Sequence, residues 1–128
     1  MSPQAMQQCI QDYFSALSNK DCDAWLATFA NDGANHDPAG SPPNSGHAVL
    51  RQYFLTVSAS FASMEIAADE FLLQGHRAAV TWNAQAVGHN DRIVKFSGID
   101  VFEMNAAGTI QSLWGFWDPA AMFAELNA

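Results

Sequence analysis

The sequence predicts a single α+β domain in which N-terminal helices precede an antiparallel β-sheet. Apolar residues recur at helical spacing in the first half of the chain and alternate with polar residues in the second half. Short turn sequences separate the expected strands, which indicates that neighbouring strands are antiparallel. The 128 residues contain no repeat, low-complexity tract or linker, so we expect one domain over residues 1–128.

Three helices are expected in the first half. Ser2 suits an N-cap and Pro3 the first helical position of a helix that buries one apolar face. That face consists of Met6, Cys9, Ile10, Tyr13, Phe14 and Leu17. Asp21 or Asp23 is expected to cap a second, short helix, which runs through Phe29 and ends at the Asn-Asp-Gly sequence after it. The third helix is expected to bury Leu50, Tyr53, Phe54 and Val57.

Strands dominate the second half. A short strand is expected over residues 34–37, and the Gly-, Ser- and Pro-rich segment 39–46 is expected to be a loop. Four longer strands with turn sequences between them are then predicted, over residues 64–73, 77–87, 92–104 and 109–117. A final short helix is expected to begin at Asp118 or Pro119 and to end at Leu126.

The composition excludes several classes of function. The net charge is −8 and the five basic residues are scattered singly, so we expect no nucleic-acid partner. No segment approaches the ~20 apolar residues of a membrane span, and the N-terminus lacks the pattern of a signal peptide. The two cysteines do not form a metal motif and suit a reducing compartment, so a cytoplasmic location is expected.

Asp100 is the most informative residue of the chain. Period-two alternation places its carboxyl group in the middle of the more apolar face of the strand over residues 92–104. An ionised carboxylate is costly to desolvate there, so the group should bind a proton or find a strong partner. A neutral carboxylic acid can donate a hydrogen bond to a developing oxyanion. The alternative is a structural acid that bonds backbone N–H groups at a bend near Gly98.

Other candidate residues have structural alternatives of the same kind. Tyr13, on the apolar helix face, needs a partner for its O–H and could be an ordinary core tyrosine. Asp37 precedes a proline and could simply initiate a turn. Large rings occupy both faces of residues 113–117, which fits either a pocket wall or a subunit interface.

Three sequence strings occur in an order that carries a resemblance. They are Tyr-Phe-Ser-Ala-Leu at 13–17, Asp-Pro-Ala-Gly-Ser-Pro-Pro at 37–43 and Ile-Asp-Val-Phe at 99–102. Over nearly the whole chain they resemble the Δ5-3-ketosteroid isomerase family of the NTF2-like, or SnoaL-like, superfamily. The Asp-Pro loop is the most specific part. The resemblance implies a cystatin-like cone, in which the curved sheet wraps around the N-terminal helices and encloses an apolar pocket.

The resemblance also implies roles for individual residues. Tyr13 matches the family's oxyanion-hole tyrosine, Asp37 its catalytic base and Asp100 its protonated aspartic acid. Trp117 falls where the family has a pocket aromatic residue. The further residues expected to bind substrate are Trp82, Phe54 and Phe102.

The chain departs from the family at two kinds of position. The tyrosines that often support the oxyanion-hole tyrosine are matched by Phe29 and Phe54, with Tyr53 one residue away. The hydrogen-bond relay is therefore shortened unless Tyr53 points inward. His36 stands where an acidic residue usually precedes the base, and strand alternation points it away from the pocket.

These observations predict a cofactor-independent isomerase that moves a proton next to a carbonyl group in a small hydrophobic substrate, as steroid Δ-isomerases do. No metal or organic cofactor is needed for this chemistry. Two alternatives remain open: another enzyme of the superfamily, such as a polyketide cyclase, dehydratase or epoxide hydrolase, or a non-catalytic module that binds small molecules. A homodimer is expected because Ile99, Val101, Leu113 and the tryptophan-rich last strand leave apolar area on or near the outer sheet face.

Overall fold

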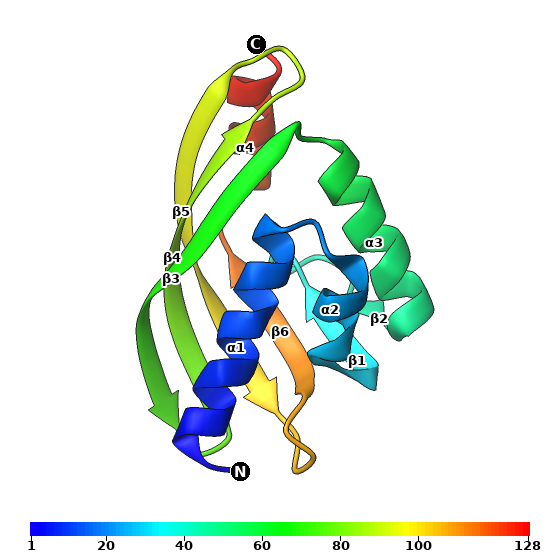
Figure 1. The fold of residues 1–128 in the computed structure, drawn as a ribbon, viewed down its shortest axis with the longest axis vertical. Helices are drawn as coiled ribbons and strands as arrows, with labels where there is room; N and C mark the ends of the chain where they lie inside the picture. Colours follow the sequence, from blue (N-terminus) through cyan, green and yellow to red (C-terminus); the bar gives the residue numbers. More distant parts are fainter.

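The computed structural model describes all residues from 1 to 128 and contains four helices and six strands (Figure 1). In chain order these are α1 (Pro3–Ser18), α2 (Cys22–Ala27), β1 (Phe29–His36), β2 (Asn44–Ser45), α3 (His47–Ala59), β3 (Ser63–Gln74), β4 (Arg77–Val87), β5 (Ile93–Met104), β6 (Ile110–Phe116) and α4 (Pro119–Leu126). The predicted α+β cone, with helices held against a curved sheet, is confirmed.

Side-chain caps begin three of the helices. Ser2 Oγ accepts a hydrogen bond from the Ala5 N–H at 3.1 Å, and Asp21 Oδ1 accepts one from Ala24 at the same distance. At α4, Asp118 Oδ1 accepts from the Ala121 N–H at 3.0 Å. Each cap satisfies a backbone donor that the first helical turn leaves unpaired. None of the four helices is long and apolar enough to cross a membrane.

The second helix is shorter than the sequence predicts. It ends at Ala27, and Phe29 is the first residue of β1 rather than the last of the helix. The carbonyl of Thr28 accepts a hydrogen bond from the Ile110 N–H at 2.8 Å, so the chain leaves the helix to join the sheet. Tertiary pairing therefore overrides the local helical pattern here.

The sheet is mixed rather than wholly antiparallel, which corrects the sequence prediction. Its strand order is β2-β1-β6-β5-β4-β3, and the meander from β3 to β6 is antiparallel as expected. However, β1 runs parallel to β6, with a register irregularity between Phe29 and Ala34. The Asn-Asp-Gly sequence within that interval was interpreted as the end of a helix. It belongs instead to a strand, which starts five residues before the expected Ala34. The two-residue strand β2 lies inside the segment that was expected to be only a loop.

The core lies between the concave face of the sheet and the helices. Its central residues come from α1, α2, α3 and the sheet, and include Ile10, Phe14, Trp25, Phe29, Leu50, Phe54, Val80 and Phe102. A smaller cluster closes one end of the sheet, where α4 packs Met122 and Leu126 against Phe61, Ala86 and Val94. The two chain ends lie at opposite ends of the long axis (Figure 1).

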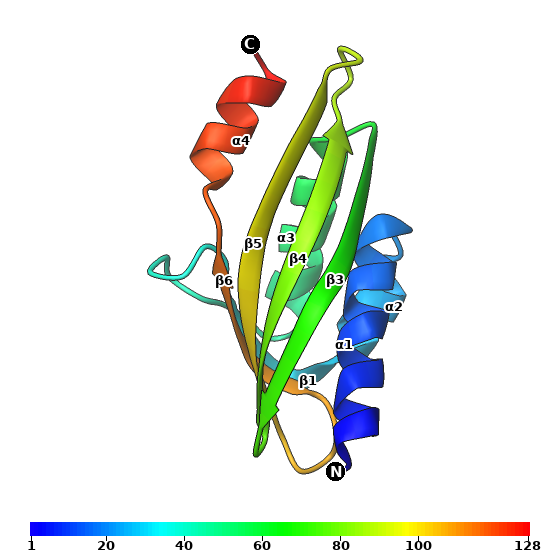
Figure 2. The same cartoon turned by 90° about the vertical axis from the view of Figure 1, so that its left-hand side faces the viewer.

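The convex face of the sheet has no helix over strands β3 to β5 (Figure 2). Ile99 of β5 and Phe116 of β6 are register partners on this face, and their exposed fractions are 44% and 52%. Leu113 was expected among the residues that leave apolar area on or near this face, but it is fully buried in the core. Strand alternation explains the correction. Leu113 and Phe116 are three positions apart, and side chains at an odd offset point to opposite faces of a strand.

Candidate active site

A small apolar cavity lies between the helices and the concave face of the sheet. Its volume is about 70 Å³, and 12 of its 16 lining residues are hydrophobic. The polar lining residues include Asp37 and Asp100. The sheet side carries these acids with Trp82 and Trp117, whereas α1, α3 and the segments after them supply most of the opposite wall.

The two acids approach each other beside a glycine. Asp100 is the register partner of Gly115 on β6, and Asp37 directly follows β1, the other neighbour of β6. A Cβ atom on Gly115 would lie 2.6 Å from Asp37 Oδ1 and 3.3 Å from Asp100 Oδ1. Because Gly115 has no side chain, both carboxyl groups have room to face the same point of the cavity.

Replacing this glycine should disturb the acids before it disturbs the rest of the fold. In Gly115→Ala the new methyl group overlaps Asp37 Oδ1, so the carboxyl group must move. We expect loss of any Asp37-dependent activity by about 10-fold or more, because a 1 Å displacement of a catalytic group is that costly. Activity and thermal melting of the variant would be measured together. Unchanged activity would show that the position of Asp37 at Gly115 does not matter for turnover.

Two donors hold the carboxylate of Asp37. The Trp117 indole N–H donates to Oδ1 at 2.6 Å, and the Tyr53 O–H donates to Oδ2 at 2.8 Å. Both oxygens accept hydrogen bonds from neutral donors, as an ionised carboxylate does. The donors come from α3 and from the residue after β6, so the position of Asp37 depends on elements far apart in the sequence.

Asp100 has the opposite environment. Its exposed fraction is 6%, no backbone N–H donates to its carboxyl group, and the polar group beside it is the Trp82 indole. Burial raises its pKa well above the usual range of an aspartic acid, and the negative charge of Asp37 raises it further. The nearby Trp82 indole offsets part of this rise. Asp100 is thus a neutral acid with an O–H group free to donate into the cavity.

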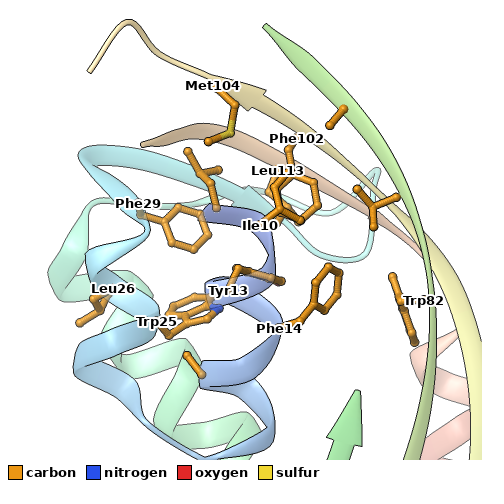
Figure 3. Packing of buried hydrophobic residues seen from close by; sticks show 14 of the residues in the cluster. Ile10, Tyr13, Phe14, Trp25, Leu26, Phe29, Trp82, Phe102, Met104 and Leu113 are labelled. Atoms are coloured by element: carbon orange, nitrogen blue, oxygen red, sulfur yellow. The ribbon is translucent and has the colours of Figure 1, made fainter. Parts of the chain in front are cut away.

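Tyr13 is a second protonated donor of the cavity. Its ring packs against Phe14, Trp25, Phe29 and Phe102 with centroid distances of 5.1–6.0 Å (Figure 3). Burial raises the pKa of its phenol well above the ordinary value, and the neighbouring carboxyl groups of Asp100 and Asp37 raise it further. The tyrosine therefore keeps its proton throughout the neutral range.

The structure brings most of the predicted site residues to one cavity. Tyr13, Asp37 and Asp100 all line it, and so do three of the four expected substrate-binding residues, Trp82, Trp117 and Phe54. Phe102 does not: it is fully buried below the lining, with its ring 5.3 Å from that of Tyr13. It can support the tyrosine from behind, but it offers no surface to a ligand. No group of three or more His, Cys, Asp or Glu side chains is placed to hold a metal ion.

Comparison with known proteins assigns the chain to a family. Residues 10–113 match the SnoaL-like domain. The chain belongs to the SnoaL-like domain family. The match supports the superfamily expected from the sequence, whereas membership of the ketosteroid isomerase family within it is not established by these comparisons.

Solved structures share the fold of this SnoaL-like domain. SalBIII, an epoxide hydrolase/cyclase-like enzyme with a role in pyran ring formation in the polyether salinomycin, is 25% identical, with a TM-score of 0.81 over 91% of this chain and 93% of SalBIII. An NTF2-like protein of unknown function from Burkholderia pseudomallei is 22% identical, with a TM-score of 0.84 over the whole of both chains. Rv0760c from Mycobacterium tuberculosis, in complex with estradiol-17β-hemisuccinate, is 18% identical, with a TM-score of 0.80 over 91% of this chain and 95% of Rv0760c.

The structure of this SnoaL-like domain shows where Tyr53 and His36, which stand at or next to the positions that depart from the ketosteroid isomerase pattern, are placed. Tyr53 does reach into the cavity, but its O–H donates to Asp37, and no hydrogen bond joins it to Tyr13. His36 stacks on Trp114, with ring centroids 5.2 Å apart, on the face of β1 opposite Asn35 and Asp37. His36 therefore has no direct contact with the cavity.

The sequence did not indicate the unpaired polar groups around the SnoaL-like cavity. Asn35 is fully buried on β1 and neither polar atom of its amide has a hydrogen-bond partner. The buried indole N–H groups of Trp25 and Trp82, which line the cavity, lie near Tyr13 and Asp100 respectively but make no hydrogen bond of normal length and angle. Such donors are costly to leave unpaired, and they suit a ligand that carries acceptor atoms. A glycine inside an aromatic strand, at Gly115, was the sequence signal for a close approach.

The contribution of the buried Asp100 to the stability of this SnoaL-like domain falls as pH rises. Because the folded pKa of Asp100 exceeds its unfolded value, the folded state binds more protons between the two pKa values, and unfolding becomes easier through that window. Asp100→Asn removes this proton linkage. We expect the variant to melt above the wild type at pH 8, by about 3 °C or more, and the difference to shrink towards pH 4. A difference that is constant with pH would contradict a raised pKa.

Proposed function

We propose that this chain is a cofactor-independent enzyme that moves a proton next to a carbonyl group in a hydrophobic substrate, as in the conversion of Δ5- to Δ4-3-ketosteroids. One observation carries the proposal. A charged and a neutral carboxyl group, Asp37 and Asp100, flank the same glycine in an apolar cavity. Carboxyl groups driven apart in protonation state are the usual arrangement of a general base and a hydrogen-bond donor.

The proposed steps use only side chains of the cavity. Asp37 removes a proton from the carbon next to the carbonyl group. The electron pair of that C–H bond forms a new C=C bond, and the π pair of the carbonyl group moves onto the oxygen to give a dienolate. Tyr13 and Asp100 donate hydrogen bonds to the oxygen as its negative charge grows. Protonated Asp37 then returns the proton to the γ-carbon, which shifts the double bond into conjugation. No net proton is gained or lost.

The apolar lining strengthens each of these interactions. Few water molecules compete in a cavity of about 70 Å³, so donors fixed by packing act on the oxygen at low local dielectric. Tyr13 is held by four aromatic rings and needs little reorganisation to reach an oxyanion. The same lining favours a flat, hydrophobic substrate.

The test is isomerisation of β,γ-unsaturated ketones of increasing size. The cavity volume lies below the several hundred Å³ usual for drug-sized ligands, so 3-cyclohexenone is the first substrate and a Δ5-3-ketosteroid the largest. The appearance of conjugated enone absorbance, lost in Asp37→Asn, supports the proposal. Absence of turnover along the whole series contradicts it.

A ring-forming acid–base reaction is a second candidate function. Two observations favour it: Tyr53 bonds Asp37 instead of supporting Tyr13, and SalBIII, described as epoxide hydrolase/cyclase-like, is 25% identical over most of both chains. In that reaction Asp100 would protonate an epoxide oxygen while Asp37 removes the proton of the attacking hydroxyl group. Cyclisation of a hydroxy-epoxide without enone isomerisation would select this candidate, and binding without either turnover would indicate a non-catalytic module.

We also propose that the chain forms a homodimer through its convex sheet face. Ile99 and Phe116 lie side by side there, and Val101 pairs with Trp114 next to them, which makes a continuous apolar patch. Patches of this kind usually mark interfaces. Light scattering at micromolar concentration should give twice the chain mass of 13.9 kDa.

Charged substitutions would locate this interface. Phe116→Asp should produce a monomer, whereas Leu55→Asp should not, because Leu55 is exposed to a similar extent (50% against 52%) but lies on α3 rather than on the sheet. A monomeric wild-type protein, or a dimer that survives Phe116→Asp and dissociates with Leu55→Asp, would contradict an interface on this sheet face.

A further inference from the structure

Lys20 differs from the other residues that line the cavity in charge and in exposure. It is the only cationic residue of the lining and the only lining residue whose side chain is exposed, so it marks the mouth. The interior is too small to enclose a molecule of several rings. Any larger ligand that reaches the two acids must therefore extend out of the cavity through the mouth, next to Lys20.

The backbone at Lys20 is in a conformation that glycine usually supplies. Its φ is 52°, in the left-handed region, and it follows Asn19, the C-cap of α1. Two hydrogen bonds close the helix end, from the Lys20 N–H to Leu17 O at 3.2 Å and from the Asp21 N–H to Ala16 O at 3.0 Å. Glycine is the common residue at this point of such a helix end. A strained side chain kept there suggests that the side chain itself is needed.

The ammonium group of Lys20 has hydrogen-bonding capacity to spare. It donates to the carbonyl of Phe61 at 2.8 Å, which holds it between the ends of α1 and α3. No carboxylate pairs with it, whereas Arg51 pairs with Asp23 and Arg77 with Glu103, each at 2.8 Å. An ammonium has three N–H donors, so two remain for a ligand.

The charges are distributed unequally between the two ends of the cavity. Lys20 lies beyond the C-terminal end of α1, and Tyr13 lies five residues before that end at Ser18, which corresponds to about 8 Å along the helix. The ionised Asp37 repels an anionic group at the end where Tyr13 and Asp100 lie, and Lys20 attracts it at the mouth. An amphiphilic ligand with one anionic end therefore has a single favourable orientation.

We propose that Lys20 binds a carboxylate at the distal end of the substrate, so that the substrate class is a hydrophobic carbonyl compound with a carboxylate-bearing tail. The proposal rests on the proposed function for the orientation of the reacting end. It assigns Lys20 to specificity, because its ammonium lies at the mouth rather than beside the acids.

Binding of two matched probes tests the proposal. The probes are 3-(6-hydroxynaphthalen-2-yl)propanoate and its methyl ester, which differ only in the tail charge, and their Kd values are measured by calorimetry at low salt. The wild type should bind the acid about three- to tenfold tighter than the ester, the range expected of one partly solvated ion pair. Lys20→Met should abolish that preference, and Lys20→Arg should keep it.

Two further variants separate this role from net charge and from folding. Lys95→Met causes the same charge change on the exposed face of β5, and it should leave the acid-to-ester ratio unchanged. Lys20→Gly suits the left-handed backbone, so it should fold at least as stably as Lys20→Met while also losing the preference. Circular dichroism melts establish that each variant is folded.

Three results would overturn the proposal: failure of the acid to bind the wild type, an acid-to-ester ratio that is the same in Lys20→Met, or an equal loss in Lys95→Met. These measurements need no turnover. Failure of the proposed isomerisation would appear instead in the enone assay, with the probe ratios unaffected.

Discussion

Asp37→Asn should abolish turnover, with a loss of about 10³-fold or more in kcat. The substitution keeps the shape of the side chain and removes the only charged group that the proposed reaction uses as a base. One amide oxygen can still accept a bond from Tyr53 or Trp117, but the amide nitrogen then faces the other donor. Some local rearrangement is therefore expected alongside the loss of the base.

The control must separate lost chemistry from lost folding. Asp69→Asn removes the same charge from an exposed position on β3 and should leave kcat unchanged. Thermal melts of both variants measure the folded fraction, and rates are compared for folded protein only. Near-normal turnover in Asp37→Asn would exclude Asp37 as the base.

Asp100→Ala should lower kcat by about 10²- to 10³-fold, which is the cost of losing one oxyanion donor in other enzymes. The effect should fall on kcat more than on KM, because the hydrogen bond strengthens as negative charge develops on the substrate oxygen. Asp100→Asn should be milder, since an amide N–H can replace the acid O–H. Steady-state kinetics of the two variants on the same ketone give this comparison.

A purely structural role for Asp100 predicts a different pattern. A carboxylate that held backbone N–H groups would be damaged by both substitutions, with equal losses of Tm and with normal kcat in the folded fraction. No backbone N–H donates to the Asp100 carboxyl group, and its polar neighbour is the Trp82 indole, which argues against that role. If the measured pattern matches it nonetheless, the oxyanion role of Asp100 is wrong.

Alternation along the chain was enough to predict the environment of Asp100, because a strand buried on one face has only two possible registers. The helix caps were predictable for the same local reason, since Ser2, Asp21 and Asp118 bond groups three residues away. The parallel pairing of β1 with β6 was not predictable in this way. It joins residues about 80 positions apart, and its local sequence, rich in Asn and Gly, is typical of a turn.

The contacts of the site likewise include some that the sequence predicted and some that it could not. The positions of Tyr13, Asp37 and Asp100 around one cavity agree with the expectation drawn from the resemblance, while their catalytic roles remain predictions. The bond from Tyr53 to Asp37 could not be deduced, because it depends on how α3 is rotated over the end of β1. Phe102 was misplaced because an apolar residue two positions from Asp100 shares its strand face, yet lies deeper beneath α1.

The division of the cavity wall between sheet and helices bears on how this protein could be redesigned. Asp37, Asp100 and Gly115 belong to strands or follow them, and the sheet fixes their mutual positions through backbone pairing. Val57 and Ser58, by contrast, project from α3 on the other side of the cavity. Libraries confined to the helical wall can therefore vary the accepted substrate while the acid pair stays in place. Libraries on β5 and β6 would alter reactivity and selectivity at once, and they are the poorer starting point for directed evolution.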